Sequence, residues 1–189
     1  PLDHHHDTAD LPEPEVFLPI PAFSVPYGCL VPEVTGGLLV AEKSISVSHV
    51  VNGCTRLQPV VMQLGQAAGA AAALCALKGI NPADLNVKEL QQTLLDAGCW
   101  LLPFNDTTPA DPWFQAVQRV GLSGIMKGKP VSKDWANGFH FHPHEVVDNK
   151  EFLATIAAVV KDRNIDFKTE QVPFRPTPES AAQIMCALF

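Results

Sequence analysis

The sequence lacks the positive charge that binding to nucleic acid requires. Its 189 residues contain 13 Lys and Arg against 20 Asp and Glu, which gives a formal net charge of −7. Proteins that bind nucleic acid or anionic membranes neutralise phosphates with clustered Lys and Arg. Because no such cluster is present, we expect neither nucleic acid nor an anionic membrane surface as a partner.

Three further absences narrow the class of protein. The five cysteines are an odd number and form no C-x-x-C pair, so neither a disulfide framework nor a zinc knuckle is expected. The most apolar stretch, residues 65–77, is shorter than the roughly 18 residues that a membrane span needs, so no span is expected. The chain begins without Met or a signal peptide, so we expect it to start within a longer protein, whether periplasmic, secreted or cytoplasmic.

The N-terminal part combines proline-rich chain with a short apolar run. Four prolines between residues 19 and 32 break helices, so residues 1–32 are predicted to be extended chain with short edge strands. After the Gly36-Gly37 turn, the apolar run at residues 38–41 predicts a short buried strand.

A long helix is the clearest element in the sequence. The helix-forming run from Pro59 to Lys78 stops at Gly79, and its 20 residues predict a helix roughly 30 Å long. Gly65 and Gly69 lie four residues apart among alanines, which gives the helix one nearly bare face. Interior glycine costs about 1 kcal/mol relative to alanine, so this face is expected to let a backbone or a ligand approach closely.

A second helix and a polar stretch follow. Asn86 as cap, with Glu89 three residues later, predicts a helix that stops at Gly98. Residues 99–102 are then expected to form a short strand or tether, and residues 103–112 a linker. We therefore divide the chain into domains at residues 1–102 and 103–189.

The second half predicts a small helical module. One helix begins at Pro112, with Trp113, Ala116, Val117 and Val120 expected on its inner face, and another covers residues 151–161. Phe141-His142-Pro143 and Phe174-Arg175-Pro176 each precede a predicted helix at a spacing of 33 residues, the second helix covering residues 179–188. The recurrence of this motif before a helix indicates a repeat.

Several motifs in the first half occur in a fixed order. They are P-Y-G-C-L-V-P at residues 26–32, L-L-V-A at 38–41, S-x-x-H ending at His49, R-x-x-P at 56–59 and G-Q-A-A-G at 65–69. This order resembles, without a gap, the C-terminal flavin-contacting segment of an FAD-dependent oxidoreductase family. The resemblance covers about residues 26–102. It implies an α+β, helix-rich fold, in which part of a flavoprotein α/β domain precedes the helical module.

The resemblance also implies a set of flavin-binding residues. A helix that starts near Pro59 presents unpaired N–H groups and partial positive charge, which suit the electron-rich edge of a flavin. Arg56 would stabilise the reduced flavin, and His49 is a candidate catalytic residue. The cofactor-binding candidates are Ala41, Glu42, Arg56, Gln58, Pro59, Gly65, Gln66 and Gly69.

The sequence departs from the family pattern in three ways. Glu42 stands where the family has glycine, which places a carboxylate close to the expected cofactor. Gly28 stands where the lead-in has arginine. No G-x-G-x-x-G turn, which would hold the FAD pyrophosphate, is present. The chain is therefore expected to need a missing N-terminal nucleotide-binding portion of the same protein, and not to retain FAD alone.

Alternating histidines near residue 140 raise the question of a metal site. His140, His142 and His144 alternate and could project from one side of a strand, and His4 to His6 form another cluster. The sequence offers neither a convincing fourth ligand nor supporting groups around them. Solvated loop histidines are therefore the favoured interpretation, and no metal residue is predicted.

Two functions compete with that of an oxidoreductase: a binding module and a polysaccharide lyase. Asp106, Trp113, the segment 124–128 and Phe141-x-Pro143 resemble an S-layer-homology repeat, which implies binding to a carbohydrate or cell-envelope polymer. Relatives of the oxidoreductase architecture are also labelled xanthan lyase, but the single tyrosine, Tyr27, offers little for β-elimination. The favoured function is completion of the flavin pocket in an oxidoreductase that acts on a small organic or carbohydrate substrate.

Overall fold

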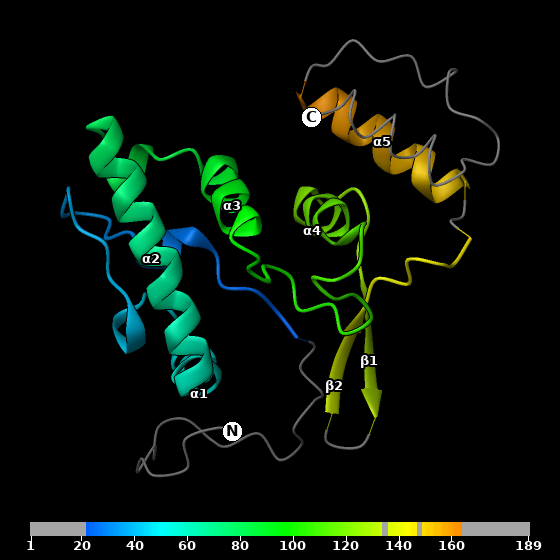
Figure 1. Ribbon diagram of the computed structural model, residues 1–189, viewed down its shortest axis with the longest axis horizontal. Coiled ribbons are helices and arrows are strands. Elements are labelled where there is room, and N and C mark those ends of the chain that lie inside the picture. The colour runs from blue at the N-terminus through cyan, green and yellow to red at the C-terminus, as the bar shows by residue number, and fades with distance from the viewer. Residues whose placement is uncertain (1–21, 134–135, 147–148, 164–189) are drawn as a thin grey trace. The chain divides into compact units, whose positions relative to one another are not determined.

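The computed structural model describes residues 22–133, 136–146 and 149–163 (Figure 1). Within these residues it has five α-helices and one two-stranded sheet, which confirms the predicted helix-rich α+β class. The chain divides into two compact units, with Ser24–Leu101 in the first and Leu102 onward in the second. The predicted repeat at Phe174-Arg175-Pro176, the helix at residues 179–188 and the His4 to His6 cluster lie outside the described residues.

The first unit is built around the long helix α2, Gln58–Lys78. The helix begins one residue before the predicted Pro59, which lies in its first turn, and ends at Gly79 as predicted. Gly79 adopts a left-handed conformation with φ of 65°, which glycine takes without steric cost. Figure 1 shows α2 beside the shorter helix α3, Val87–Asp96.

Apolar side chains join α2 to α3. Ala71 and Cys75 of α2 form a buried cluster with Leu90 and Leu94 of α3 and with Leu85, which precedes it. Burial of a leucine side chain contributes about 1.5–3 kcal/mol, so this cluster holds the two helices together. Asn86 caps α3 as predicted, since its side-chain oxygen accepts a hydrogen bond from the Lys88 N–H at 3.0 Å.

The segments that precede α2 in the chain pack against the N-terminal half of this helix. They comprise three short elements: the 3₁₀ turns η1, Tyr27–Leu30, and η2, Glu42–Ser44, and the helix α1, His49–Thr55. A second cluster, formed by Leu30, Ile45 and Leu64, packs η1 and the chain after η2 against α2. A further 3₁₀ turn, η3, Pro82–Asp84, connects α2 to α3.

Two predictions for this region are wrong. Residues 38–41 are not a strand, although the Val40 N–H donates to the Leu30 carbonyl at 2.8 Å. A single backbone bond is not a ladder, and the described residues of this unit offer no strand to pair with it. The second error is an omission: no helix was predicted between residues 46 and 56, where the structure has α1, capped by the Ser48 side chain.

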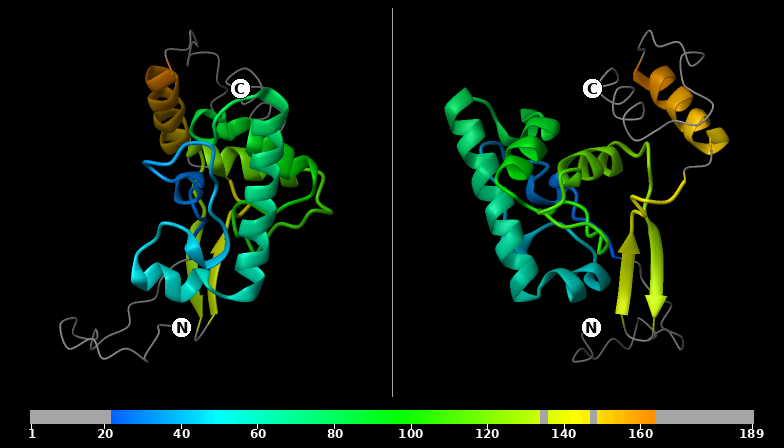
Figure 2. Two further views of the ribbon diagram at one scale, coloured as in Figure 1. Left: turned by 90° about the vertical axis from the view of Figure 1, so that its left-hand side faces the viewer. Right: turned by 45° about the vertical axis from the view of Figure 1, so that its right-hand side comes forward.

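The second unit comprises α4, Phe114–Ser123, the strands β1, Lys129–Lys133, and β2, Ala136–His140, and the helix α5, Asn149–Arg163. The strands form an antiparallel hairpin, visible in Figure 2, in which Lys129 pairs with His140. Gly128 immediately precedes the hairpin. A larger residue would not fit there, because a Cβ at this position would lie 2.5 and 2.9 Å from the rings of Phe104 and Phe139.

The core of the second unit includes residues that were predicted to lie in a linker. The stretch 103–112, expected to be a linker, contributes Phe104 and Thr107, each only 1% exposed. The ring of Phe104 stacks on Phe139 with centroids 5.2 Å apart. This stretch is therefore part of the folded unit.

The predicted inner face of α4 is partly wrong. Val117 and Val120 are buried as expected, but Trp113 and Ala116 are exposed. Trp113 is the N-cap, and the inner positions are filled by Phe114 and Gln118. The helix predicted at residues 151–161 is present within α5, and its Phe152 and Ile156 are buried.

Candidate functional site

The predicted flavin residues lie on three consecutive elements of the first unit. Ala41 and Glu42 form the start of η2, which contacts α2. His49 is the first residue of α1, and Arg56 is the residue that ends it. Gln58 and Pro59 form the first turn of α2 immediately afterwards. A short, tightly turned stretch of chain therefore positions all of these residues.

The N-terminal end of α2 is open and electropositive. Leu57, Gln58 and Pro59 are exposed, and no side chain caps the end. The first-turn N–H groups have no partner within a helix and carry a partial positive charge. The first turn contains no acidic residue, and Arg56 precedes it. This end can therefore stabilise an electron-rich group.

His49 and Arg56 lie at the two ends of α1. Seven residues are nearly two helical turns, so the two residues lie on about the same side of the helix, roughly 10 Å apart along its axis. His49 is exposed and Arg56 is partly buried. Between them, the side-chain oxygen of Asn52 is buried and has no hydrogen-bond donor in the described structure. A buried acceptor of this kind is normally paired, so a donor from outside the described residues would satisfy it.

Glu42 adopts a backbone conformation that suits glycine. Its φ is 63°, in the left-handed region that non-glycine residues seldom occupy. A glycine, which the resembled pattern has at this position, would adopt this conformation without strain. The carboxylate that Glu42 adds is exposed to solvent.

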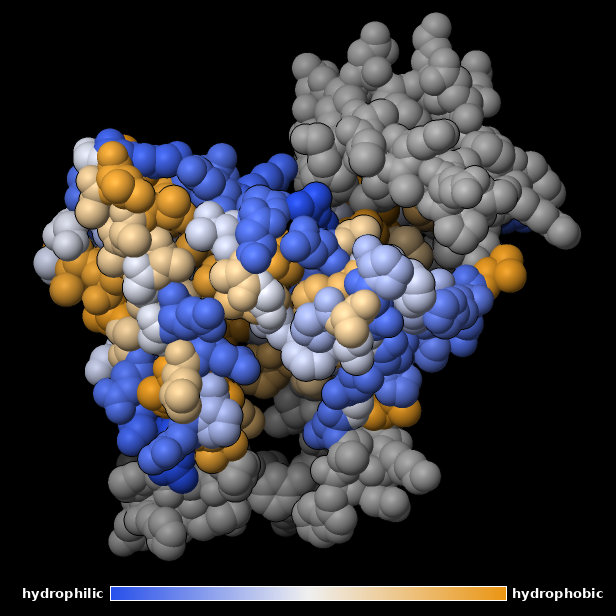
Figure 3. All heavy atoms as spheres, in the orientation of Figure 1, coloured by the Kyte–Doolittle hydropathy of each residue, from blue (hydrophilic) through white to orange (hydrophobic). Residues whose placement is uncertain are grey.

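The bare face of α2 is open to solvent. Gly65, Gln66 and Gly69 are exposed, and a Cβ added at either glycine would meet nothing within 4 Å. The glycines therefore serve no contact within the described chain. Met62 and Leu77 on the same helix are 74% and 85% exposed. Figure 3 shows apolar colours over the side of the unit where α2 lies.

The length and composition of α2 would also allow it to cross a membrane. Its apolar window has a mean hydropathy of 1.6, and only 17% of that window is buried within the described chain. No span was expected because the most apolar stretch, residues 65–77, is shorter than α2 itself. Helices from the core of soluble proteins have the same properties, but they are normally covered.

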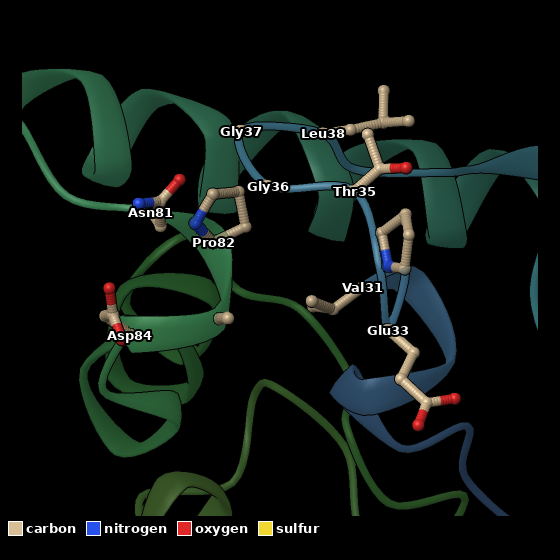
Figure 4. A pocket seen from close by; sticks show the side chains of 11 residues that line it. Val31, Glu33, Thr35, Gly36, Gly37, Leu38, Asn81, Pro82 and Asp84 are labelled. Carbon is tan, nitrogen blue, oxygen red and sulfur yellow. The ribbon is translucent and has the colours of Figure 1, made fainter.

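A cavity of about 220 Å³ lies elsewhere in the first unit (Figure 4). The Gly36-Gly37 turn forms one side, and the segment from Asn81 to Asp84 forms the other. None of the predicted flavin residues lines it. The cavity is therefore separate from the surface formed by Arg56 and the start of α2.

The hydroxyl of Tyr27 has a structural role. It donates a hydrogen bond to the Pro82 carbonyl at 2.9 Å and thereby links η1 to η3. Burial, and then the nearby Cys75, raise the pKa of Tyr27 above its ordinary value. A tyrosine that serves as a base must lose its proton easily, so this environment disfavours Tyr27 as the base of a lyase.

The second unit brings together two of the three alternating histidines. His140 and His142 have ligand atoms within 4.8 Å of each other and of the Asp106 carboxylate. His144 instead contacts Trp113 edge to face, with ring centroids 5.3 Å apart. Sequence reasoning missed Asp106 as a partner because 34 residues separate it from His140. The signal available was that Asp106 and Phe141 both belong to the positions that resemble one repeat pattern.

Asp106 holds the chain around these histidines. Its two carboxylate oxygens accept the backbone N–H groups of Phe141 and His142 at 2.8 and 2.6 Å. Burial alone would raise the pKa of Asp106. The hydrogen bonds from these two groups and from its own N–H, together with the charge of His140, outweigh burial and lower the pKa below its ordinary value. The Asp106 carboxylate is therefore stabilised in its ionised form.

Comparison with known proteins finds one match. No curated protein matches the chain, and no solved structure does. Residues 1–94 match the family model described as FAD dependent oxidoreductase. This range includes every predicted flavin residue and ends before Leu102, from which the chain belongs to the second unit. It is residues 1–94, with the open end of α2 among them, that carry the match to the FAD dependent oxidoreductase family.

Proposed function

We propose that this chain is the C-terminal portion of an FAD-dependent oxidoreductase, and that its first unit completes the flavin pocket of the intact protein. The observation that carries the proposal is the exposed N-terminal end of α2, preceded by Arg56 and free of acidic residues in its first turn. The family match over residues 1–94 supports a flavin as the ligand of this surface.

The residues present fit one edge of a flavin. The chemistry that FAD supplies when bound is the acceptance of a hydride from an organic substrate. The N–H groups of the first turn of α2 would donate to the electron-rich edge of the ring, and the Arg56 guanidinium would stabilise negative charge there. The bare face at Gly65 and Gly69 would let the ring or a covering backbone approach the helix closely. The substrate class is a small organic or carbohydrate molecule.

The exposed apolar surface of α2 supports a missing partner. An uncovered helix with Leu77 85% exposed leaves hydrophobic area in water that a folded protein normally buries. We propose that the N-terminal nucleotide-binding portion of the same protein covers it. The chain alone lacks a pyrophosphate-binding turn and is expected to bind no FAD and to be inactive.

The test uses the proposed longer protein, in which a nucleotide-binding portion precedes Pro1. It should purify yellow, with an absorption band at roughly 450 nm, the position of oxidised flavin. Arg56→Ala should weaken flavin binding about tenfold, the effect of losing one charge-assisted hydrogen bond of about 1.5 kcal/mol. Arg56→Lys should lose less because it keeps the charge.

The matched control is Arg119→Ala, which removes an exposed arginine that contacts Gln115 in the second unit. Flavin content should not change in this variant. A colourless longer protein, or equal flavin loss from Arg56→Ala and Arg119→Ala, would contradict the proposal. An upstream sequence without a dinucleotide-binding turn would contradict it as well.

A second candidate function concerns the second unit alone. The motif positions that resemble an S-layer-homology repeat meet in one place: Asp106 binds the backbone of Phe141, and Gly128 lies beneath Phe104 and Phe139. This convergence favours a module that binds a carbohydrate of the cell envelope. Sedimentation of the purified, flavin-free chain with cell-wall glycan, and loss of sedimentation in a chain ending at Leu101, would support it. Equal sedimentation of both chains would contradict it.

A further inference from the structure

The second unit contains a cluster of metal-ligating side chains that lies outside the family match, and of its members only Asp106 is a defined position of the repeat pattern. Asp106 lies in the loop before α4, His140 ends β2, and His142 follows in the next turn. Their ligand atoms all lie within 4.8 Å of one another, and all three residues are partly buried. An ion bound at about 2.0–2.2 Å would require only a small inward rotation of the side chains.

The position of the carboxylate is fixed by the backbone. Asp106 accepts the N–H groups of Phe141 and His142, one on each oxygen, and each oxygen keeps a further lone pair. The adjacent Asn105 binds Phe139 twice, accepting its N–H at 2.7 Å and donating to its carbonyl at 2.8 Å. The loop is thus attached to the end of β2 on both sides of His140. A ligand whose position is set before binding loses little entropy when the ion binds.

His142 has the supporting carboxylate that metal-bound histidines usually have. Its Nδ1 lies 3.1 Å from Oε1 of Glu145. A hydrogen bond from Nδ1 to a carboxylate fixes the tautomer and leaves Nε2 with the lone pair that a metal needs. The backbone of His142 is also held in the left-handed region, with φ of 60°, by its hydrogen bond to Asp106. Such a conformation costs about 1 kcal/mol and persists only where the surroundings enforce it.

We propose that Asp106, His140 and His142 bind one divalent transition-metal ion, supported by Glu145. Two imidazoles and one carboxylate suit zinc and its first-row neighbours, whereas magnesium and calcium prefer oxygen ligands throughout. Three protein ligands leave at least one coordination position open to water or to another ligand. The ion would clamp the loop before α4 to the end of the hairpin.

The test is calorimetric titration of the full chain with zinc. The background variant replaces His4, His5 and His6 with alanine, because this second histidine cluster could bind zinc by itself. The background should bind one zinc ion per chain. Adding His140→Ala or His142→Ala should abolish this binding, and Glu145→Gln should weaken it about tenfold, the usual effect of losing a supporting carboxylate.

His144→Ala is the matched control, since His144 belongs to the same alternating run but contacts Trp113 instead. It should bind zinc as the background does. A second measurement needs no substitution at the site: zinc should shift the ring proton resonances of His140 and His142 and leave those of His144 unchanged. A background chain that binds no zinc, or ring resonances of His140 and His142 that do not respond, would overturn the proposal.

Discussion

Two hydrogen bonds join the side chain of Gln118 to the backbone of Leu102 in the second unit. The side-chain oxygen of Gln118 accepts the Leu102 N–H at 2.7 Å, and its side-chain nitrogen donates to the Leu102 carbonyl at 3.0 Å. Gln118 is completely buried. A side-chain amide thus replaces the neighbouring strand that would otherwise satisfy these backbone groups.

Replacing Gln118 with leucine should destabilise the protein strongly. Leucine fills the space but leaves the N–H and carbonyl of Leu102 without partners, at about 1–3 kcal/mol for each group. Urea denaturation should therefore show a loss of about 2–6 kcal/mol in the free energy of unfolding. Gln115→Leu, one turn earlier on the exposed side of α4, should change it by less than about 0.5 kcal/mol. Equal losses in the two variants would contradict the role of the pair.

Glu42 should be a site where glycine stabilises the protein. Its φ of 63° costs a non-glycine residue about 1 kcal/mol, so Glu42→Gly should raise the free energy of unfolding by up to that amount. Glu33→Gly is the control, since Glu33 is an exposed residue without a positive φ and should lose stability through chain entropy. In the longer protein, Glu42→Gly should also increase flavin content, because it removes a carboxylate close to the proposed ring. A loss of stability from Glu42→Gly would show that the carboxylate is needed.

Asp106 should make stability depend on pH in the acidic range. Its folded pKa lies below the ordinary value of 3.8. A lowered pKa means that its contribution is fully present above the unfolded pKa and is lost as pH falls through the folded pKa. The difference in unfolding free energy between the native chain and Asp106→Asn should therefore be constant between pH 5 and 7 and shrink below about pH 4. Denaturation in EDTA checks this, with Asp84→Asn, an exposed carboxylate, as control.

Local signals in the sequence were sufficient for the helices with strong ends. Asn86 and Gly79 bound their helices as predicted, because capping depends on a few neighbouring residues. The helix α1 was missed because Val50, Val51 and Gly53 disfavour helix, and tertiary packing overrides that preference. The prediction of a strand at residues 38–41 was wrong for the opposite reason. An apolar run indicates burial, but a strand needs a neighbouring strand.

The candidate sites show the same division between local and distant information. The order of motifs from Arg56 to Gly69 was sufficient to predict the family match, because these residues are close in sequence. The cluster of Asp106 with His140 and His142 could not be predicted, since it depends on how the hairpin returns to the loop before α4. The burial of Gln118 could not be predicted either, because its partner is the backbone of Leu102 rather than a side chain with a recognisable pattern.

The glycines of α2 should have opposite effects in this chain and in the proposed longer protein. In the chain described here, Gly65→Ala and Gly69→Ala introduce a Cβ that meets nothing within 4 Å, so each should stabilise the helix by about 0.5–1 kcal/mol. In the longer protein, the proposed covering backbone or flavin lies against this face, so the same substitutions should lower flavin content. Gly79→Ala is the control, because its φ of 65° makes it destabilising in both contexts. Thermal unfolding of the chain and the ratio of flavin to protein absorbance in the longer product measure the two effects. If both alanine variants stabilise the longer protein without losing flavin, the bare face of α2 is not the surface that the cofactor and its domain cover.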